Sequence, residues 1–329
     1  MIFATTPALP VPPQSDRVAI SLLPKNTVAH DAHMAAQPFM TQIEVGGSAP
    51  DTSLNFPFTV AAWNLERCLF PKASAEMLRR IGAEVVLLSE MDSGMARTDQ
   101  ANTTAQVACH LGMAYAYGVE FLELGLGSDT ERAFCTDAHN EKGFHGNALM
   151  ARVPLYRPFM LRLPGARHWF LNGGDQPRLG ERMAIGAVIQ TTDGPLVTVS
   201  THLESVSDAP SREAQLAALI DALDAHFPGH PILIGGDLNT GNNIGGDHRD
   251  ETLFAHAAAR GFATHGGAET TMTTRPSLIT RWPDRAMKLD WFLSRGVTAE
   301  RVQIIPSLDD DGRPLSDHDL LSCRITGLA

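Results

Sequence analysis

The chain has 329 residues, 43% of them hydrophobic, which is enough for a sizeable buried core. Its 26 lysine and arginine residues and 37 aspartate and glutamate residues give a formal net charge of −11 at pH 7. This balance, without any run of basic residues, disfavours proteins that hold nucleic acid by neutralising many phosphates.

The first 57 residues differ in character from the rest of the chain. Pro10, Pro12 and Pro13 are followed by polar stretches with little periodicity, so we expect residues 1–57 to form an extended N-terminal arm, partly ordered by lying against the core. No basic region precedes the prolines and no run of about 20 apolar residues occurs, so we expect neither a signal peptide nor a membrane span. Four scattered cysteines without zinc-site spacing favour a reducing, cytoplasmic compartment, although several disulfide pairings stay open.

Apolar runs alternate with amphipathic segments in the remainder of the chain. The apolar runs predict strands over 58–62, 85–88, 148–152, 184–190, 196–200, 231–234, 289–293 and 320–325. Helical spacing and capping residues predict helices over 73–81, over 104–111, from an N-cap at Ser211 to about Pro228, and over 251–260 after an N-cap at Asp250. Strands interleaved with helices predict an α/β protein built from layers.

Polar side chains follow most of these strands at the point where each strand ends. Carboxylates, amides and imidazoles are costly to bury together unless they share a metal ion or a hydrogen-bond network, so their repeated appearance at strand ends predicts a functional site. The segments are Trp63-Asn64-Leu65-Glu66, Ser89-Glu90-Met91-Asp92, Thr201-His202-Leu203, Gly235-Gly236-Asp237-Leu238-Asn239, Leu289-Asp290-Trp291 and Ser316-Asp317-His318-Asp319.

In this order and with these neighbours, the segments resemble the endonuclease/exonuclease/phosphatase superfamily. That superfamily comprises metal-dependent phosphoesterases such as deoxyribonucleases, abasic-site endonucleases, sphingomyelinases and inositol-polyphosphate 5-phosphatases. The resemblance extends from about residue 58 to the C-terminus. It implies a four-layer α/β sandwich of two packed mixed β-sheets flanked by helices, with residues 58–329 as a single catalytic domain.

The resemblance also implies a divalent metal ion, Mg²⁺ or Mn²⁺. Both ions prefer hard oxygen ligands and usually bind through one or two carboxylates while keeping waters and substrate oxygens. Glu90 is the first candidate ligand, supported by Asn64 and Asp317. Glu66 is expected to hold the metal through a water molecule, and its alternative is a solvated surface charge.

The remaining strand-end residues match catalytic roles. Asp237 is expected to orient or deprotonate the attacking water, and Asn239 to donate its amide to the phosphate or to polarise the same water. His318 is expected to bind a phosphoryl oxygen as a cation or to help position the nucleophile, with Asp290 as its orienting partner. His202 is the candidate that stabilises or protonates the leaving group.

A further candidate site residue, Asn147, lies directly before the strand predicted over 148–152. Its segment Gly146-Asn147-Ala148 resembles a family strand that borders the phosphate. We expect its amide to act as a transition-state donor. The neighbouring His145 is as well explained by a place in the pocket wall as by a catalytic role.

Substrate identity is open at this point. The insertion 125–142 before the Asn147 strand carries more acidic than basic residues, and such a rim favours a small phosphodiester or a ligand with a cationic group over a polyanionic strand. We therefore expect hydrolysis of a small-molecule or lipid-head-group phosphate ester. The alternatives are a metal-dependent nuclease acting on DNA or RNA and, more remotely, an inactive binding module of the same fold. The oligomeric state is unknown.

Overall fold

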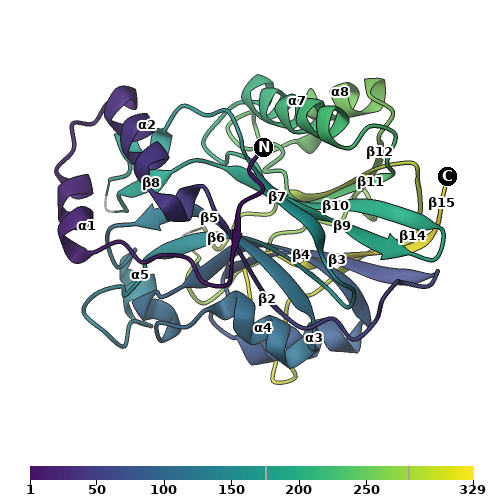
Figure 1. Ribbon diagram of the computed structural model, residues 1–329, viewed down its shortest axis with the longest axis horizontal. Helices are drawn as coiled ribbons and strands as arrows, with labels where there is room; N and C mark the ends of the chain where they lie inside the picture. Colours follow the sequence, from purple (N-terminus) through teal and green to yellow (C-terminus); the bar gives the residue numbers. More distant parts are fainter. Residues whose placement is uncertain (175, 281) are drawn as a thin grey trace.

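The computed structural model describes residues 1–174, 176–280 and 282–329. Within these residues the chain forms two mixed β-sheets that pack face to face, with helices on both outer sides (Figure 1). The fold class expected from the sequence, a four-layer α/β sandwich, is confirmed.

The larger sheet has the strand order β1-β2-β5-β6-β4-β3-β15-β14, with β8 paired to β5. Strands β3 and β4 run parallel, and their outer neighbours β15 and β6 run antiparallel to them. The bounds are β1 (Thr5–Thr6), β2 (Ile43–Gly47), β3 (Phe58–Arg67), β4 (Ala83–Ser93), β5 (Ala114–Glu123), β6 (Phe144–Ala151), β8 (Arg178–Gly180), β14 (Val297–Ile305) and β15 (Leu320–Leu328).

The smaller sheet has the order β12-β13-β11-β10-β9-β7. Its parallel pair is β10 and β11, and the other neighbours are antiparallel. The bounds are β7 (Tyr156–Arg162), β9 (Met183–Thr191), β10 (Gly194–His202), β11 (Ile232–Asp237), β12 (Ala263–His265) and β13 (Asp290–Arg295). All the strands expected from the apolar runs are therefore present.

The central strands bury both of their faces, which explains why they read as continuous apolar runs. In β3, Val60 and Ala62 belong to the core between the two sheets, whereas Ala61 and Trp63 pack beneath the outer helices. Successive side chains of a strand point to opposite faces, so one apolar run supplies two cores.

Helices α3 (Pro71–Arg80) and α4 (Thr103–Leu111) cover the larger sheet, and α7 (Ala209–His226) and α8 (Leu253–Ala259) cover the smaller one (Figure 1). The N-cap of α7 is Asp208 rather than the expected Ser211. The side chain of Asp208 accepts the backbone N–H of Ser211 at 3.0 Å, so the helix begins one turn earlier.

Helix α8 begins later than expected. Asp250 does not cap it but lies in a short 3₁₀ helix, and the next residue, Glu251, has extended backbone. The carboxylate of Glu251 accepts the N–H of Gly241 at 2.7 Å and binds the Arg212 guanidinium, and these tertiary contacts hold the segment out of the helix. The remaining helices are α1 (Gln14–Ser21), α2 (Thr27–Ala36), η1 (Pro38–Met40), η2 (Ala96–Thr98), α5 (Asp129–Arg132), α6 (His168–Leu171) and η3 (His248–Asp250).

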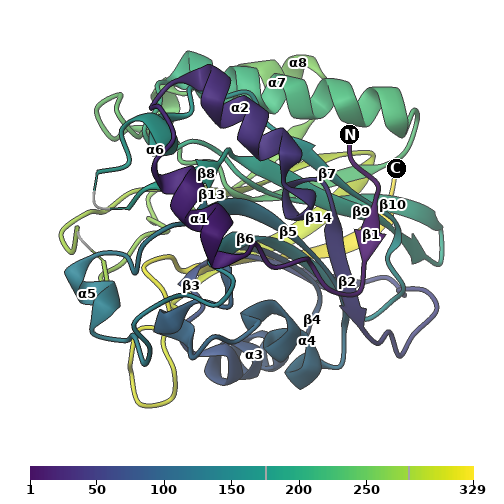
Figure 2. The same cartoon turned by 60° about the vertical axis from the view of Figure 1, so that its left-hand side comes forward.

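Residues 1–57 contain α1 and α2, which stand side by side at one end of the sheets (Figure 2). The segment therefore differs from the extended arm that its composition suggested. Its strand β2 pairs with β5, and Arg17 donates to the carbonyl oxygens of Glu141 and Lys142 at 2.6 Å each. The N-terminal segment thus adds a strand to the larger sheet and fastens the end of the insertion 125–142.

A search of the described helices finds none that combines the length and the apolar character needed to cross a membrane.

Candidate active site

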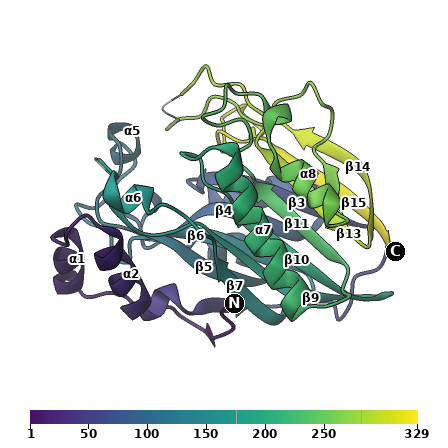
Figure 3. The same cartoon turned by 90° about the horizontal axis from the view of Figure 1, so that it is seen from above.

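Strand register explains how residues far apart in the sequence meet. His202 pairs with Asp237 across β10 and β11, and Asp237 pairs with Asp290 across β11 and β13. In the larger sheet Asn64 pairs with Ser89, the residue directly before Glu90. The candidate side chains from both sheets therefore emerge at one edge of the sandwich, where the long loops of the second half of the chain gather (Figure 3).

A pocket of about 360 Å³ opens at this edge, within the usual size range of small-ligand sites. Asn64 and Asp290 lie behind its surface and are hydrogen-bonded to residues that line it. The predicted site residues that line the pocket are Glu66, Glu90, His202, Asp237, Asn239, Asp317 and His318.

The turns that carry these residues adopt unusual backbone conformations. Glu66, Glu90 and Asn239 have φ values of +43°, +58° and +51°, a left-handed region that non-glycine residues seldom adopt. Gly236, before Asp237, has φ of +143°, and a Cβ there would meet the Thr201 carbonyl oxygen at 2.0 Å. Such strained positions cluster at functional sites, where surrounding contacts hold them in place.

Asp237 lies at the centre of the site and is 1% exposed. Its Oδ1 accepts the backbone N–H of Asn239 at 2.8 Å, and its Oδ2 accepts Nδ2 of Asn64 at 3.1 Å. The same Oδ2 lies 3.5 Å from Nε2 of His202 and 3.6 Å from Nε2 of His318. One fixed carboxylate oxygen therefore lies between two imidazole nitrogens.

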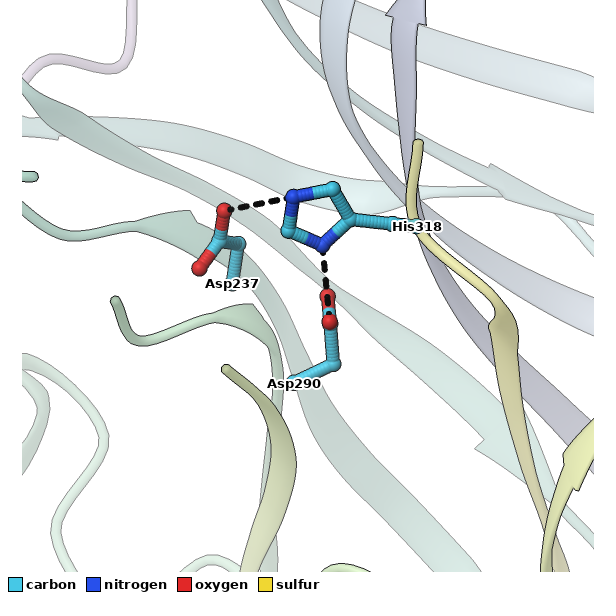
Figure 4. Close-up of side chains that lie close together, drawn as sticks. All are labelled: Asp237, Asp290 and His318. Carbon is cyan, nitrogen blue, oxygen red and sulfur yellow. Dashed lines mark hydrogen bonds and ion pairs between the residues drawn. The ribbon is translucent and has the colours of Figure 1, made fainter. Parts of the chain in front are cut away.

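Asp290 and His318 form a hydrogen-bonded pair, as the sequence predicted. Oδ2 of Asp290 lies 2.8 Å from Nδ1 of His318, which directs Nε2 of the same ring toward Asp237 (Figure 4). Burial opposes a charge on His318, but the carboxylates of Asp290 and Asp237 outweigh it and raise the pKa of His318 well above its usual range. His318 is therefore held as a cation at the pocket surface.

His202 has a carboxylate near its Nδ1, but the hydrogen-bond partner of that nitrogen is Arg182, whose Nη1 lies 2.9 Å away. The same Nδ1 lies 3.6 Å from Oε2 of Glu120, whose other oxygen accepts a hydrogen bond from Arg182 at 3.1 Å. Burial opposes the charge of Glu120, but Arg182 and His202 outweigh it and lower its pKa to about 2. Glu120 is a site residue that the pattern of polar strand ends does not indicate. The signal for it in the sequence is an acidic residue inside a run that is otherwise apolar, Val119-Glu120-Phe121-Leu122.

A second group of acidic side chains lies on the larger-sheet side of the pocket. Oε1 of Glu90 accepts Nδ2 of Asn64 at 3.1 Å, and Oε2 of Glu66 accepts the backbone N–H of Asp317 at 3.0 Å. Oδ1 of Asn64 accepts the N–H of Glu66 at 3.0 Å. The amide nitrogen of Asn64 thus faces Glu90 and Asp237, so this side chain orients carboxylates rather than presenting its oxygen to the pocket.

Burial and the closeness of other carboxylates raise the pKa values of two acidic side chains in this group, Glu66 and Asp317. Burial raises the pKa of Glu66 well above its usual range, and the Asp317 carboxylate adds to the effect. Burial, opposed by His318 and assisted by Glu90, raises the pKa of Asp317 to about 6. A divalent cation would relieve this repulsion, and the all-oxygen donor set of Glu66, Glu90 and Asp317 suits Mg²⁺ or Mn²⁺.

Among the described residues, the candidate ligand atoms that gather within 4.8 Å of one another are those of Asp237, Asp290 and His318, and the oxygens of Glu66, Glu90 and Asp317 are not gathered this closely. In the closer set Nδ1 of His318 is already engaged by Asp290, and the imidazole nitrogen is a softer donor than Mg²⁺ prefers. The three carboxylates of the larger-sheet side therefore suit a hard divalent cation better, and the Asp290–His318 pair is better explained as a histidine with its orienting partner.

A cation, Arg67, lies within this group of acidic side chains. The pattern of polar strand ends in the sequence does not indicate it. It forms an ion pair with Glu90, and its Nε lies 2.8 Å from Oε1 of Glu131. Burial opposes the charge of Arg67, but the surrounding carboxylates outweigh it and hold its pKa above the usual value. Burial likewise opposes a negative charge on Glu90, but Arg67 and two histidines lower its pKa well below the usual value, so Glu90 stays ionised.

Replacement of Asp317 by asparagine should stabilise the metal-free protein at neutral pH. The folded-state pKa of Asp317 is about 6 against 3.8 for the free side chain, so the folded state binds more protons between these two pH values. The free energy of unfolding must therefore fall as the pH rises from about 4 to about 6 and stay lowered above pH 6. Because 29% of the Asp317 side chain is exposed, solvent screening reduces the effect, and we expect a gain of about 1 kcal/mol or roughly 2 °C in Tm.

Thermal unfolding of wild type and Asp317→Asn in EDTA, at pH 4 and at pH 7.5, measures this difference. The two melting temperatures should converge at pH 4. In Mg²⁺ the order should reverse, because only the wild type gains from metal binding. A variant that is destabilised at pH 7.5 in EDTA would show that Asp317 makes stabilising contacts and not repulsive ones.

Asn147 is not brought to the pocket. It is fully buried in β6, and its Nδ2 donates to the carbonyl oxygen of Met183 at 3.0 Å. The expected role as a transition-state donor is therefore at odds with the structure, since the amide points into the contact between β6 and β9. The neighbouring His145 does line the pocket, and its Nδ1 lies 2.9 Å from Oδ1 of Asp92.

The insertion 125–142 also departs from expectation. Glu131 is buried and pairs with Arg97 at 3.0 Å in addition to Arg67, so it adds no net negative charge to the rim. The pocket wall instead carries Arg67, Arg178, Arg182 and Arg285. The carboxylates of Glu66, Glu90, Glu131, Asp237 and Asp317 line the same pocket, so the charge of its wall is mixed, and the insertion 125–142 contributes only the paired carboxylate of Glu131 to it.

Comparison with known proteins agrees with this geometry. Residues 61–318 match the sequence model of the Endonuclease/Exonuclease/phosphatase family. The search of curated proteins finds no match.

Solved structures with a similar fold include an endonuclease/exonuclease/phosphatase from Beutenbergia cavernae, 18% identical with a TM-score of 0.57, covering 82% of this chain and 71% of that one. The human Nocturnin catalytic domain with bound sulfate anion is 18% identical with a TM-score of 0.57, covering 87% of this chain and 97% of that one. D. rerio TDP2 complexed with single strand DNA product is 17% identical with a TM-score of 0.55, covering 83% and 100%. At such identities the likeness to these structures shows the fold alone.

Proposed function

Because the chain belongs to the endonuclease/exonuclease/phosphatase family, we propose that its pocket hydrolyses a small-molecule or lipid-head-group phosphate ester with Mg²⁺ or Mn²⁺. Members of this family are metal-dependent hydrolases of phosphodiester bonds, and the chain is a metal-dependent hydrolase acting on phosphate esters. The observation that carries the proposal is the position of Oδ2 of Asp237 between the Nε2 atoms of His202 and His318.

The roles follow from what each side chain can do at its position. A bound divalent cation, held by Glu90, Asp317 and Glu66, would supply charge neutralisation for the phosphate oxygens and acidify a bound water. Asp237 orients the attacking water and accepts its proton, because its carboxylate is fixed by two hydrogen bonds.

The imidazoles and the amide complete the proposed mechanism. His318, kept protonated by Asp290, binds a non-bridging phosphoryl oxygen, and His202 delivers a proton to the leaving oxygen. Asn239 uses one amide hydrogen on the Leu203 carbonyl at 2.9 Å and keeps a second for the phosphate. We assign no catalytic role to Asn147.

Charge supports the choice of a small substrate. The net charge of −11 and the lack of basic runs oppose the tracking of a long polyanion, whereas a single phosphoryl group needs only the metal ligands, Asn239 and the histidines. A nuclease is the second candidate, supported by the arginines in the pocket wall and by the similarity to TDP2 complexed with single strand DNA product. An inactive binding module is opposed by the complete set of candidate catalytic side chains.

A metal-dependent activity screen with Glu90→Gln as the test variant checks the proposal. We expect wild type to hydrolyse bis-p-nitrophenyl phosphate, p-nitrophenyl phosphate, sphingomyelin or inositol phosphates in Mg²⁺ and not in EDTA. Glu90→Gln should lower kcat by on the order of a hundredfold or more and weaken Mg²⁺ binding, because a metal ligand loses its charge. The fold should survive, since Arg67 keeps Glu131 as a partner.

The same screen should include plasmid DNA and single-stranded RNA. A kcat/KM for nucleic acid at physiological salt above that for small diesters would promote the nuclease candidate. Wild-type activity of Glu90→Gln at limiting Mg²⁺ would remove Glu90 from the mechanism.

We also propose a domain division and a cellular location for the chain. Residues 58–329 form the catalytic domain, with residues 1–57 as an added segment. The location is the cytoplasm, a proposal supported by four cysteines that are all free thiols.

A further inference from the structure

One wall of the pocket carries an exposed tryptophan. Trp282 lines the same pocket as Asp237 and His318, yet it is 68% exposed. A large aromatic side chain left open to solvent loses the free energy that burial would supply, so its exposure next to a site suggests that a ligand covers it.

Hydrogen bonds order residues 277–280, and one of them reaches the backbone N–H of Trp282. The hydroxyl of Ser277 accepts the N–H groups of Ile279 and Thr280 at 3.2 and 3.0 Å, and the hydroxyl of Thr280 accepts the N–H of Trp282 at 3.3 Å. Thr130 of α5 donates to the carbonyl oxygen of Ile279 at 3.1 Å. These contacts hold Ile279 and Thr280 at the pocket wall.

Arg285 follows Trp282 on the same wall and differs from the other pocket arginines. Its recorded partners among the described residues are neutral: Nη2 donates to Oδ1 of Asn242, and Nε lies 2.9 Å from Sδ of Met287. Asn242 in turn donates to Oδ1 of Asn239 at 2.6 Å. The Arg285 charge is therefore uncompensated by these contacts and is linked through one side chain to Asn239, a proposed phosphate ligand.

The other three pocket arginines are neutralised by carboxylates. Arg67 pairs with Glu90 and Glu131, and Arg178 and Arg182 pair with glutamates at 3.0 and 3.1 Å. A cationic head group placed here would meet the charge of Arg285, which pairs with no carboxylate among the described residues. An anionic group would instead be attracted to it.

We propose that Trp282 stacks on a planar ring of the substrate and that Arg285 binds a second anionic group, so that the substrate is a small nucleotide-like phosphodiester with a second phosphate. This inference rests on the proposed function only in that the reacting phosphate lies beside Asp237. The pocket volume of about 360 Å³ suits one such unit rather than a long strand. Lipid head groups without a planar ring are a poorer match to this wall.

Binding measurements in EDTA test the inference without metal-dependent turnover. Thymidine 3′,5′-bisphosphate carries both features, thymidine 5′-phosphate lacks the second phosphate, and an abasic deoxyribose 3′,5′-bisphosphate lacks the ring. Calorimetric titration of the full-length wild type should give the tightest Kd for the first of these three probes.

Variants of the two residues should act on different parts of the ligand. Trp282→Ala should weaken thymidine 3′,5′-bisphosphate by on the order of tenfold, the usual worth of base stacking, with little effect on the abasic probe, and Trp282→Phe should restore most of the loss. Arg285→Gln should weaken both bisphosphates and leave thymidine 5′-phosphate nearly unchanged. Matched controls outside the pocket are Tyr156→Ala, which removes an exposed aromatic ring, and Arg80→Gln, which removes an exposed cation.

The outcomes separate this inference from the proposed function. Equal losses on the thymidine and abasic probes, or no nucleotide binding by wild type, overturn the inference. Failure of wild type to hydrolyse any ester in Mg²⁺, with Trp282-dependent nucleotide binding intact, overturns the proposed function and leaves the binding site in place. Hydrolysis of an aliphatic diester with the same kcat/KM as a nucleoside diester also counts against the inference.

Discussion

Asp237→Asn is expected to cause one of the two largest losses of activity, lowering kcat by on the order of a thousandfold while changing KM little. The substitution keeps the size of the side chain but removes the group that would accept a proton from water. The carboxamide oxygen can still accept the N–H of Asn239, so the turn after β11 should persist, whereas the hydrogen bond that Oδ2 accepts from Nδ2 of Asn64 is lost. Steady-state kinetics on the best substrate of the metal screen measure the loss.

Metal binding and folding provide the controls for this variant. Calorimetric Mg²⁺ titration should give nearly wild-type affinity, because the proposed ligands Glu66, Glu90 and Asp317 are untouched. Asp193→Asn, the same change in an exposed turn between β9 and β10, should retain full activity. Loss of Mg²⁺ affinity in Asp237→Asn would make Asp237 a metal ligand and would leave the base unassigned.

The second large effect is expected from the pair Asp290 and His318. Each of Asp290→Asn and His318→Ala should lower kcat/KM by on the order of a hundredfold, whereas the double variant should be scarcely slower than the worse single variant. The reason is the 2.8 Å contact between Oδ2 of Asp290 and Nδ1 of His318, through which the carboxylate acts on the reaction. Losses that multiply would show that the two residues act independently.

The pH profile adds a readout that a merely structural role would not change. The carboxylates of Asp290 and Asp237 raise the pKa of His318 against the effect of burial, so its cation is present at low pH and is lost as the pH rises through that raised value. Asp290→Asn removes one of the two carboxylates. The alkaline limb of the kcat/KM profile should therefore move to lower pH in this variant, and an unmoved limb would separate Asp290 from His318.

The sequence was a good guide to the strands and to most of the site. Runs such as 85–88 and 231–234 are apolar throughout because their strands are buried on both faces. Such a run can be recognised in the sequence without knowing which elements pack against the strand. Polar residues next to the ends of such runs must lie at a sheet edge, so Asp237 and Glu90, which follow runs, and His318, which precedes the run 320–325, could be identified from the sequence. Helix starts were less certain, because Asp208 and Ser211 are both good caps and Glu251 is held by tertiary contacts.

The sequence by itself determined the alternation of strands and helices, the family resemblance and the identity of the strand-end side chains. Only the tertiary structure decided which charges cancel. Glu131 reads as an acidic residue of an exposed loop, but it is buried between Arg67 and Arg97, and Asn147 reads as a phosphate ligand, but its amide binds Met183. Such outcomes depend on distances between residues far apart in the chain, because electrostatic and hydrogen-bond energies act over a few ångströms in space, whatever the separation along the sequence.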